Sequence, residues 1–423
     1  LFLTGRGVRV DKTKAVYWIR RAAEQDMAHA QETLGAMYDE GNGVESDYAE
    51  AAHWYRLAAE QGRAKAQFRL ATLYKEGLGV AQDDAIALGF YRRAAEQGLA
   101  PAQLELGMHF RNPGDKQDHS EAVKWFRLAA GQGMGPAQFN LGLAYALGQG
   151  VTQDEAEAAN WYRMAAEQGI APAQNNLGAM YKHGRGVPQD LGEAAKWYRL
   201  AAEQGNMVGQ YNFAVAVGYG RGVPRDLGQA REWYRLSAEQ GFADAQNNLG
   251  AFYLRGVGMD SDFREALKWY RRAAAQGHPR ALHSLGYMYR TGRGVERDHV
   301  EAVEWYRKAA DRGLAMAQLW LGLMYRYGQG VPQDYGEAAA WFRLAAEQGN
   351  ATGQLNLGLL HASGTGVPQD LAEAYKWLSL AVSRVEEEVR DDAIAIRDKT
   401  AADMTPSQLD EGRRRVQEWE RDY

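Results

Sequence analysis

The stretch from Ala173 to Val208, AQNNLGAMYKHGRGVPQDLGEAAKWYRLAAEQGNMV, decides the fold because most of the chain repeats it. The next copy begins at Gly209 and the previous one at Ala137, so the period is 36 residues. A fixed period of this length is the signature of a repeat solenoid. The sequence therefore predicts a row of similar small units in place of the two or three globular domains that 423 residues would otherwise suggest.

The first half of each unit reads as an amphipathic helix. Ala173, Leu177 and Tyr181 follow one another at four-residue intervals, which places them on one helical face. Gly184 then predicts a left-handed helix end, and Gly186 a sharp turn in the connector. We expect this helix to bury its apolar face against other helices.

The second half predicts another helix. Asp190 is suited to cap its first turn, and Glu193 three residues later completes a capping-box pattern. Trp197, Tyr198 and Ala201 form the apolar stripe. Neither helix can hide its stripe alone, so each unit requires its neighbours.

These residues resemble the Sel-one-like repeat, a relative of the tetratricopeptide repeat. The shared pattern is A-x-x-x-L-G-x-x-Y-x-x-G-x-G-V-x-x-D-x-x-x-A-x-x-W-Y-x-x-A-A-x-x-G, and it covers the chain to about Leu380. The resemblance implies an all-α fold, a right-handed α/α superhelical solenoid of helix-turn-helix repeats. It also implies an adaptor that binds other macromolecules.

The repeat pattern sets the expected domains. A solenoid spans residues 1–381, with an incomplete first unit (1–29) and ten units that begin at Ala30, Ala66, Ala102, Ala137, Ala173, Gly209, Ala245, Ala281, Ala317 and Gly353. The third unit has Arg111 to Asp115 in place of the usual connector, where we expect a local change of superhelical path. Residues 382–423 are expected to form a helical cap, ending in a helix from Ser407 to about Glu420 that Thr405 and Gln408 cap.

Composition excludes several classes of site. The chain has no cysteine, so it has no disulfide, no thiolate metal site and no cysteine nucleophile. The net charge of −5 gives no overall field for nucleic acid, and no apolar run has the length of a membrane span. We expect a periplasmic or cell-envelope protein, with the cytoplasm as the alternative. The chain begins in mid-repeat at Leu1, so we expect a signal peptide, a linker or further repeats upstream.

No pattern in the chain predicts catalysis. The G-x-G pairs precede helix caps and follow no strand, so they are connectors and not nucleotide loops. The nine histidines are scattered and none forms H-x-x-x-H. His361 replaces the tyrosine of the repeat and is expected to be a packed variant. We therefore expect no enzyme, no metal and no cofactor; a hydrolase is the least favoured alternative.

Two columns of the repeat have a structural interpretation. Ten of the twelve tryptophans recur at one position, which predicts that they are core residues: Trp18, Trp54, Trp125, Trp161, Trp197, Trp233, Trp269, Trp305, Trp341 and Trp377. An arginine stands two residues after the tryptophan position in ten units, from Arg20 to Arg343, and usually has an acidic residue four positions later. This spacing predicts exposed ion pairs on a solvated helix face.

The face opposite the core of the first helix is the candidate binding surface. With Leu177 pointing to the core, residues 175, 179 and 182 lie on the other side, because successive residues advance by 100°. In tetratricopeptide relatives that side lines the inner groove. Many units have apolar residues there, so either the face binds a partner or superhelical winding buries it between neighbouring first helices.

Trp320, which stands where most units have Asn, marks the centre of the predicted site. Aromatic residues and arginine are enriched at interface hot spots. The candidate groove residues are His283, Tyr287, Arg290, Trp320, Leu323, Arg326, Tyr327, Phe68, Phe139 and Tyr211. We expect a scaffold that binds another protein or a peptide segment in this groove, with no nucleic acid. The alternative is an envelope protein that binds peptidoglycan or an exported polysaccharide.

Overall fold

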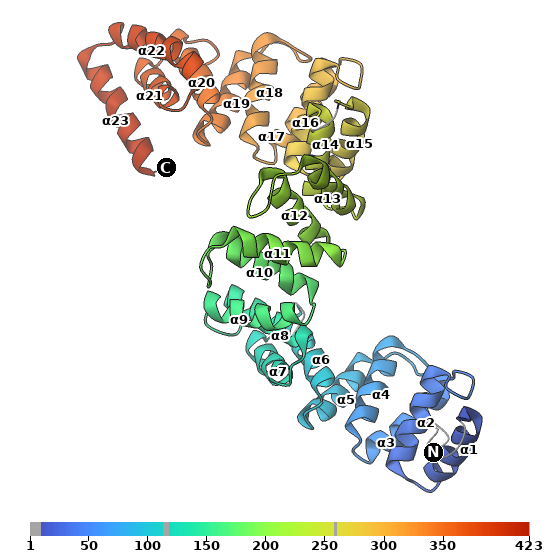
Figure 1. Ribbon diagram of the computed structural model, residues 1–423. Helices are drawn as coiled ribbons and strands as arrows, with labels where there is room; N and C mark the ends of the chain where they lie inside the picture. The colour runs from blue at the N-terminus through green and yellow to red at the C-terminus, as the bar shows by residue number, and fades with distance from the viewer. Residues whose placement is uncertain (1–9, 113–117, 258–259, 423) are drawn as a thin grey trace. The chain divides into compact units, whose positions relative to one another are not determined.

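The computed structural model describes residues 10–112, 118–257 and 260–422. Within these ranges the chain folds into 23 α-helices and no strand, which confirms the all-α prediction. Figure 1 shows the helices following one another in pairs. Each repeat contributes a first helix, a short connector and a second helix.

The helix boundaries repeat with the period of the sequence. The first helices are α2 (Ala28–Glu40), α4 (Ala64–Glu76), α6 (Ala100–Arg111), α8 (Gly135–Leu147), α10 (Ala171–His183), α12 (Met207–Tyr219), α14 (Ala243–Arg255), α16 (Pro279–Thr291), α18 (Ala315–Tyr327) and α20 (Ala351–Ser363). The second helices are α1 (Lys12–Ala23), α3 (Tyr48–Glu60), α5 (Asp84–Glu96), α7 (His119–Gly131), α9 (Glu155–Glu167), α11 (Leu191–Glu203), α13 (Leu227–Glu239), α15 (Phe263–Ala275), α17 (His299–Ala310), α19 (Tyr335–Glu347) and α21 (Leu371–Val382). Two further helices follow, α22 (Glu387–Ala402) and α23 (Pro406–Asp422).

Contacts divide the chain into two compact units within α12. One comprises the residues up to Asn212 together with Arg221–Val223, and the other Phe213–Gly220 together with the residues from Pro224 onward. Both are built in the same way. Within each unit the two helices of a repeat pack against each other, as α10 does against α11 and α14 against α15. A second helix also packs against the first helix of the next repeat, as α9 does against α10 and α13 against α14.

The predicted helix ends are present. The Asp190 carboxylate accepts from the backbone N–H groups of Gly192 and Glu193, and Gly184 ends α10 in the left-handed region at φ +67°. The Glu193 side chain does not complete a capping box as expected; it accepts from the Lys196 ammonium at 3.0 Å. Lys196 lies within reach on the next turn and neutralises the carboxylate.

The second connector glycine is required by a close approach between repeats. Gly186 has φ +65°, and a Cβ there would lie 2.0 Å from the carbonyl oxygen of Glu155, at the start of the preceding second helix. No side chain fits in that space, so this glycine joins consecutive repeats as well as turning the chain.

The most deeply buried aromatic residue follows the tryptophan. A Cβ on Gly178 would lie 2.8 Å from Cδ1 of Tyr198, so the missing side chain of α10 makes room for the ring of α11. Tyr55, Tyr270 and Tyr306 are at most 2% exposed and lie over the corresponding glycines. Most repeats thus close on a glycine–tyrosine contact, or on a glycine–phenylalanine contact where Phe replaces Tyr. Ala71 and Ala214 stand in the glycine position of two other repeats, and Gly358 of the last repeat faces Leu378.

The tryptophans are less uniformly buried than expected. Trp54, Trp269 and Trp377 are buried, most of the others are partly buried, and Trp18 is 54% exposed. Where a core contact is seen, the ring packs backward: Trp197, for example, lies against the core formed by α9 of the preceding repeat and α10 of its own repeat. Trp18 is exposed because α1 is the first described helix and has no described predecessor. The prediction that the whole column is core is therefore wrong at Trp18.

A ladder of glutamines, buried on the first helices and exposed at the ends of the second helices, joins successive repeats. Gln174 donates from Nε2 to the carbonyl of Ala166 in the preceding repeat at 3.0 Å, and its Oε1 accepts from Gln204 of its own repeat at 2.7 Å. Gln67 and Gln97 make the same contacts in the repeat that contains α4. The ladder satisfies buried polar groups at the repeat boundary.

The ladder is interrupted in two repeats. In the repeat of α16 and α17, Leu282 replaces the acceptor glutamine and Arg312 replaces the donor. Leu282 is 2% exposed and needs no partner. In the last repeat Arg384 stands in the donor position, and Oε1 of Gln354 is buried without a hydrogen-bond partner among the described residues.

The arginine column does not form the expected row of ion pairs. Most of these side chains donate to a tyrosine hydroxyl 18 residues later, on the next first helix, as Arg56 does to Tyr74 at 2.8 Å and Arg271 to Tyr289 at 2.9 Å. Arg199 and Arg235 do form the predicted pairs, with Glu203 and Glu239 at 2.7 Å each. For Arg199, Val217 stands where that tyrosine would be. His361 occupies the tyrosine position opposite Arg343 and is 6% exposed, as expected of a packed variant.

The connector of the third unit lies mostly outside the described residues. Its helix α6 ends at Arg111, followed by an extended Asn112 in place of a left-handed glycine. The expected change of path at Pro113 to Asp115 falls on residues that the structure does not describe.

The C-terminal helices pack against the last repeat. Helix α21 ends at Val382, and a separate helix, α22, begins at Glu387. Thr405 and Gln408 form the predicted capping box at the start of α23. Val416 and Trp419 of α23 lie on the core of α19 to α21.

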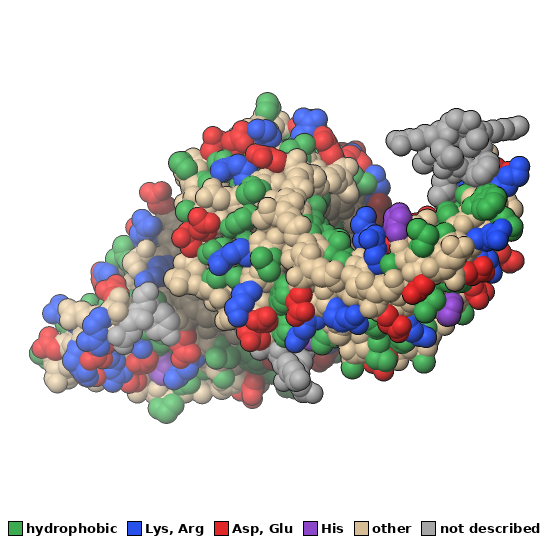
Figure 2. Space-filling model, turned by 90° about the horizontal axis from the view of Figure 1, so that it is seen from below, with side chains coloured by type: hydrophobic (Ala, Val, Ile, Leu, Met, Phe, Trp, Pro, Cys, Tyr) green, Lys and Arg blue, Asp and Glu red, His purple; other side chains and the backbone are tan. Residues whose placement is uncertain are grey.

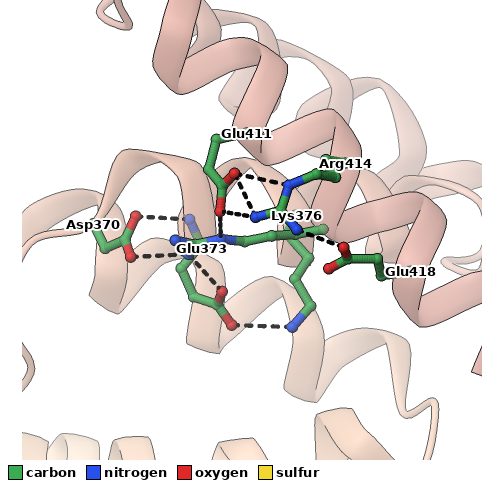
Figure 3. Close-up of polar contacts among 7 residues, drawn as sticks. Asp370, Glu373, Lys376, Glu411, Arg414 and Glu418 are labelled. Carbon is green, nitrogen blue, oxygen red and sulfur yellow. Dashed lines mark hydrogen bonds and ion pairs between the residues drawn. The ribbon is translucent and has the colours of Figure 1, made fainter.

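Ion pairs between side chains hold α23 against α21, and Figure 3 shows these charged side chains. Arg415 donates to Asp370, which caps α21, and to Glu373 of α21 at 2.9 Å each, and to Glu411 of α23 at 2.8 Å. Burial raises the pKa of Glu373, but Lys376 and Arg415 outweigh it and hold that pKa below its ordinary value.

Candidate binding surface

The predicted groove column packs largely onto second helices. Phe68 lies 5.6 Å from Tyr91 and Phe139 lies 5.9 Å from Tyr162, measured between ring centroids, and each pair belongs to one repeat. Phe68, Phe139 and Tyr211 are partly exposed, whereas Leu319 in the same column is 5% exposed. Burial between helices therefore accounts for part of the apolar character that suggested a binding face.

The centre of the predicted site is a packed aromatic stack. The ring centroid of Tyr306 of α17 lies 5.4 Å from that of His283 and 6.2 Å from that of Trp320, and the Trp320 ring is nearly parallel to it. The guanidinium carbon of Arg290 lies 4.0 Å from the centroid of Trp320. These four side chains tie α16, α17 and α18 together, so Trp320 has a structural role.

His283 is a neutral, mostly buried residue. Burial, and to a smaller extent the Arg290 charge, lowers its pKa to about 4. It is therefore uncharged at neutral pH. Its Nε2 has no hydrogen-bond partner among the described residues.

The remaining predicted residues differ in exposure. Leu323 packs on the core of α19 and α20, and Arg326 donates to Asn356 of α20. Tyr287 is partly exposed beneath Arg290 and Arg293, whose guanidinium carbons lie 5.7 Å and 5.3 Å from its ring centroid. Tyr327 is 60% exposed. The structure thus brings His283, Arg290 and Trp320 together and leaves Tyr327 as the most accessible member.

A pocket of about 690 Å³ opens one repeat earlier, in the unit that begins at Phe213. It lies along α14 and extends to the end of α12, to α13, to α15 and to the starts of α16 and α18. Its lining residues are Gly218, Tyr219, Arg225, Leu227, Tyr234, Asn247, Asn248, Ala251, Phe252, Arg255, Val257, Tyr270, Arg280, His283, Ser284, Leu314 and Met316. Of the predicted groove residues, only His283 lines it.

Small side chains keep this pocket open. Ala251 stands where other first helices have Leu143, Tyr287 or Leu323, and Ser284 stands where the next repeat has Trp320. By contrast, the cavity on the corresponding face of α8 has a volume of only about 10 Å³, and Leu143 and Asn140 are among the residues that line it. The sequence marks the pocket by small residues, Ala251 and Ser284, in columns that hold larger residues in other repeats. The predicted binding centre is instead at an aromatic residue, Trp320.

The described residues lack the features of a metal site and of a membrane span, and on the face drawn in Figure 2 they also lack those of a nucleic-acid surface. Among them no three His, Asp or Glu side chains are grouped so as to hold a metal ion, and no helix is long and apolar enough to cross a membrane. On the face drawn in Figure 2, acidic and basic side chains of the described residues are interspersed. A nucleic-acid surface would instead show a basic stripe.

A chain of consecutive helix pairs with a pocket on one helical face is an α-solenoid repeat protein. The Sel1 repeat is recognised eleven times, at residues 1–27, 28–62, 64–99, 100–134, 135–170, 171–206, 208–242, 243–278, 279–314, 315–350 and 351–384. The chain belongs to the Sel1 repeat family, which confirms the resemblance seen in the sequence.

Solved structures agree with this assignment. The chain is 36% identical to c5321, a protective antigen present in uropathogenic Escherichia coli strains that displays an SLR fold; the match covers 96% of this chain and 94% of that chain, with a TM-score of 0.65. It is also 36% identical to a Sel1 repeat protein from Oxalobacter formigenes, over 73% of this chain and 90% of that chain, with a TM-score of 0.58. A search of curated proteins gave no match.

Proposed function

We propose that this protein is a non-enzymatic interaction scaffold that holds a peptide segment of a partner protein on the face of its first helices. The observation that carries the proposal is the pocket of about 690 Å³ along α14, which is within the size range of specific ligand sites. Its wall combines aromatic rings, such as Tyr234 and Phe252, with amide side chains. A folded repeat array also supplies a rigid surface that loses little entropy when it binds.

The test is to fill the pocket without disturbing the core. The Ser284→Trp substitution places an indole where the next repeat already accommodates Trp320. We expect it to abolish binding of peptides selected on the full chain from a random library, with an unchanged melting temperature. Ser284→Ala is the matched control, because it leaves the pocket open. Failure to select any peptide, or selected peptides that bind the Ser284→Trp variant equally well, would contradict the proposal.

Tyr327 and Arg326 are proposed as flanking contacts outside the pocket. Tyr327 is 60% exposed, and large exposed aromatic rings contribute strongly to interfaces. The Tyr327→Ala variant should weaken binding of a long partner segment while leaving stability unchanged. Phe68, Phe139 and Tyr211 are proposed in the same role for the unit that ends at Asn212, and unchanged affinity in their alanine variants would assign them to packing alone.

We also propose that residues 382–423 are a cap on the solenoid of residues 1–381. Support comes from the packing of Val416 and Trp419 and from the ion pairs of Arg415. The Arg415→Ala variant should lose about 1–2 kcal/mol of cap stability, since it removes charge-assisted hydrogen bonds between α21 and α23. Limited proteolysis would measure this, with the exposed Arg413→Ala as the control. Equal cleavage of the two variants would contradict a docked cap.

A periplasmic or cell-envelope location is proposed on the likeness to c5321, which is described as a protective antigen. An antigen that protects must be reached by the immune system, so an envelope protein fits that description. Fractionation of cells that express the tagged protein tests this, and recovery in the cytoplasm alone would favour the alternative location. Retention on purified peptidoglycan, lost in the Ser284→Trp variant, would favour the cell-wall function instead of peptide binding.

A further inference from the structure

We propose that the pocket along α14 binds an acidic peptide segment, in which two carboxylate side chains flank one aromatic or large aliphatic side chain. This inference rests on the proposed function and specifies its ligand. It follows from the charge of the pocket, from its apolar wall and from its length.

The charged side chains of the pocket are all cationic. Arg225, Arg255 and Arg280 line it, and no Asp or Glu does so. All three are exposed, and none has a carboxylate within 4.0 Å among the described residues; the one hydrogen bond seen is from Arg225 Nε to the carbonyl of Gly218 at 3.2 Å. In a chain of net charge −5 this is a local excess of positive charge. Guanidinium groups bind carboxylates through paired hydrogen bonds, so an acidic ligand is the complementary one.

The middle of the pocket is suited to an uncharged side chain. Tyr234, Phe252 and Tyr270 contribute ring surface, and Leu314 and Met316 contribute aliphatic surface. Tyr270 is 2% exposed and Tyr234 is also 2% exposed, so these rings are held firmly by the core. A rigid aromatic wall favours burial of one large apolar side chain.

Polar groups without charge are placed to pair with a peptide backbone. Asn247 and Asn248 line the pocket, and Nε2 of His283 lacks a partner among the described residues. A buried imidazole nitrogen without a partner is costly, and a peptide N–H or C=O group would satisfy it. A ligand made of hydrocarbon alone would leave it unpaired.

The positions of the arginines set the spacing of the ligand. Arg225 lies in the connector between α12 and α13 and Arg255 is the last residue of α14, whereas Arg280 lies in the first turn of α16. By the 36-residue repeat, position 280 corresponds to 244 on α14, eleven residues before Arg255. Eleven helical residues span about 16 Å, which an extended peptide covers in about five residues. The two acidic residues of the ligand are therefore four to six positions apart.

The experiment is a selection from a library of random twelve-residue peptides on the full chain, followed by affinity measurements on the selected peptides. We expect pairs of Asp or Glu four to six positions apart, with Phe, Tyr, Trp, Leu or Met between them. The double variant Arg255→Ala, Arg280→Ala should bind these peptides at least about tenfold more weakly. Affinity should also fall as salt rises, because the arginines are exposed.

Arg264→Ala is the matched control, since Arg264 is exposed on α15, carries the same charge and does not line the pocket. Its affinity should stay within about twofold of the parent chain. Selected peptides that are neutral or basic but are excluded by Ser284→Trp would overturn this inference and leave the proposed function intact. Acidic peptides that bind the double arginine variant as tightly as the parent would do the same. If no peptide is selected, or only soluble peptidoglycan fragments occupy the pocket, both the inference and the proposed function fail.

Discussion

Two neighbouring stretches of the first-helix face differ mainly in the size of three side chains. At the pocket the three columns are Asn247, Ala251 and Ser284, and one repeat later they are His283, Tyr287 and Trp320. The glycine–tyrosine contact beneath is the same in both, with Gly250 under Tyr270 and Gly286 under Tyr306. The repeat fold therefore accepts either an open pocket or a filled stack on the same core. Recognition can vary along the chain without a change of architecture.

The largest expected difference concerns the buried tyrosines. Tyr306→Ala removes a fully buried ring that packs against His283 and Trp320, and it should cost about 3–5 kcal/mol of unfolding free energy. Tyr270→Ala should cost less free energy of unfolding, because the Tyr270 ring borders the pocket and Ser284 stands where Trp320 stacks on Tyr306 one repeat later. Urea unfolding of the two variants would measure this, and equal losses would show that the stack adds nothing to stability.

The second expected effect depends on pH and involves His283. Its folded pKa of about 4 is below the ordinary value near 6.5, so the unfolded chain takes up the proton first as the pH falls. The stability that neutral His283 provides is complete above pH 6.5 and is lost progressively toward pH 4. The loss is at most about 3 kcal/mol.

His283→Asn, which copies the residue at the pocket, is the control for this effect. Unfolding free energies of parent and variant at pH 7 and pH 4.5 should differ in slope. A parent chain with the same pH dependence as the variant would contradict a buried neutral histidine in the stack.

A third and smaller effect is expected from Trp320→Ser, which copies Ser284 into the filled stretch. The indole is only partly buried, so its loss should cost about 2 kcal/mol, less than the loss of a core aromatic residue. The variant should also gain a hollow beside Tyr306. A crystal structure of the variant would show that hollow, and collapse of α18 onto Tyr306 would indicate that bulk alone does not decide which stretch is open.

The smallest expected effect comes from Arg290→Gln. Arg290 lies over the Trp320 ring, and a cation–π contact of this kind is worth about 1 kcal/mol. Removing its charge should also raise the pKa of His283, since the guanidinium lowers that pKa. NMR titration of the imidazole measures the shift, and an unchanged pKa would assign the whole effect to burial.

The repeat architecture was predictable from the sequence because its signals are local. The Asp190 cap, the Gly184 helix end and the apolar spacing of Leu177 each act within one helix or turn, and each has the expected conformation. The family assignment follows from the same residues.

The site was less predictable because it depends on contacts between repeats. Trp320 looked like an exposed hot spot, yet it stacks on Tyr306, a residue 14 positions earlier on another helix. The pocket is marked by small residues such as Ala251, whose effect appears only when neighbouring helices are in place. The arginine column was misjudged for the same reason, since its tyrosine partners lie 18 residues away.

The glutamine ladder has a consequence for how such a chain can lengthen. Gln174 and Gln204 lie in the same 36-residue repeat and are hydrogen-bonded to each other. The hydrogen bond that Gln174 is seen to make to the preceding repeat is to a backbone carbonyl, which any preceding repeat supplies. Tandem duplication of that segment would create a new boundary with its polar groups already matched. Gene duplication could thus extend the array in single steps, without compensating mutations at the junction.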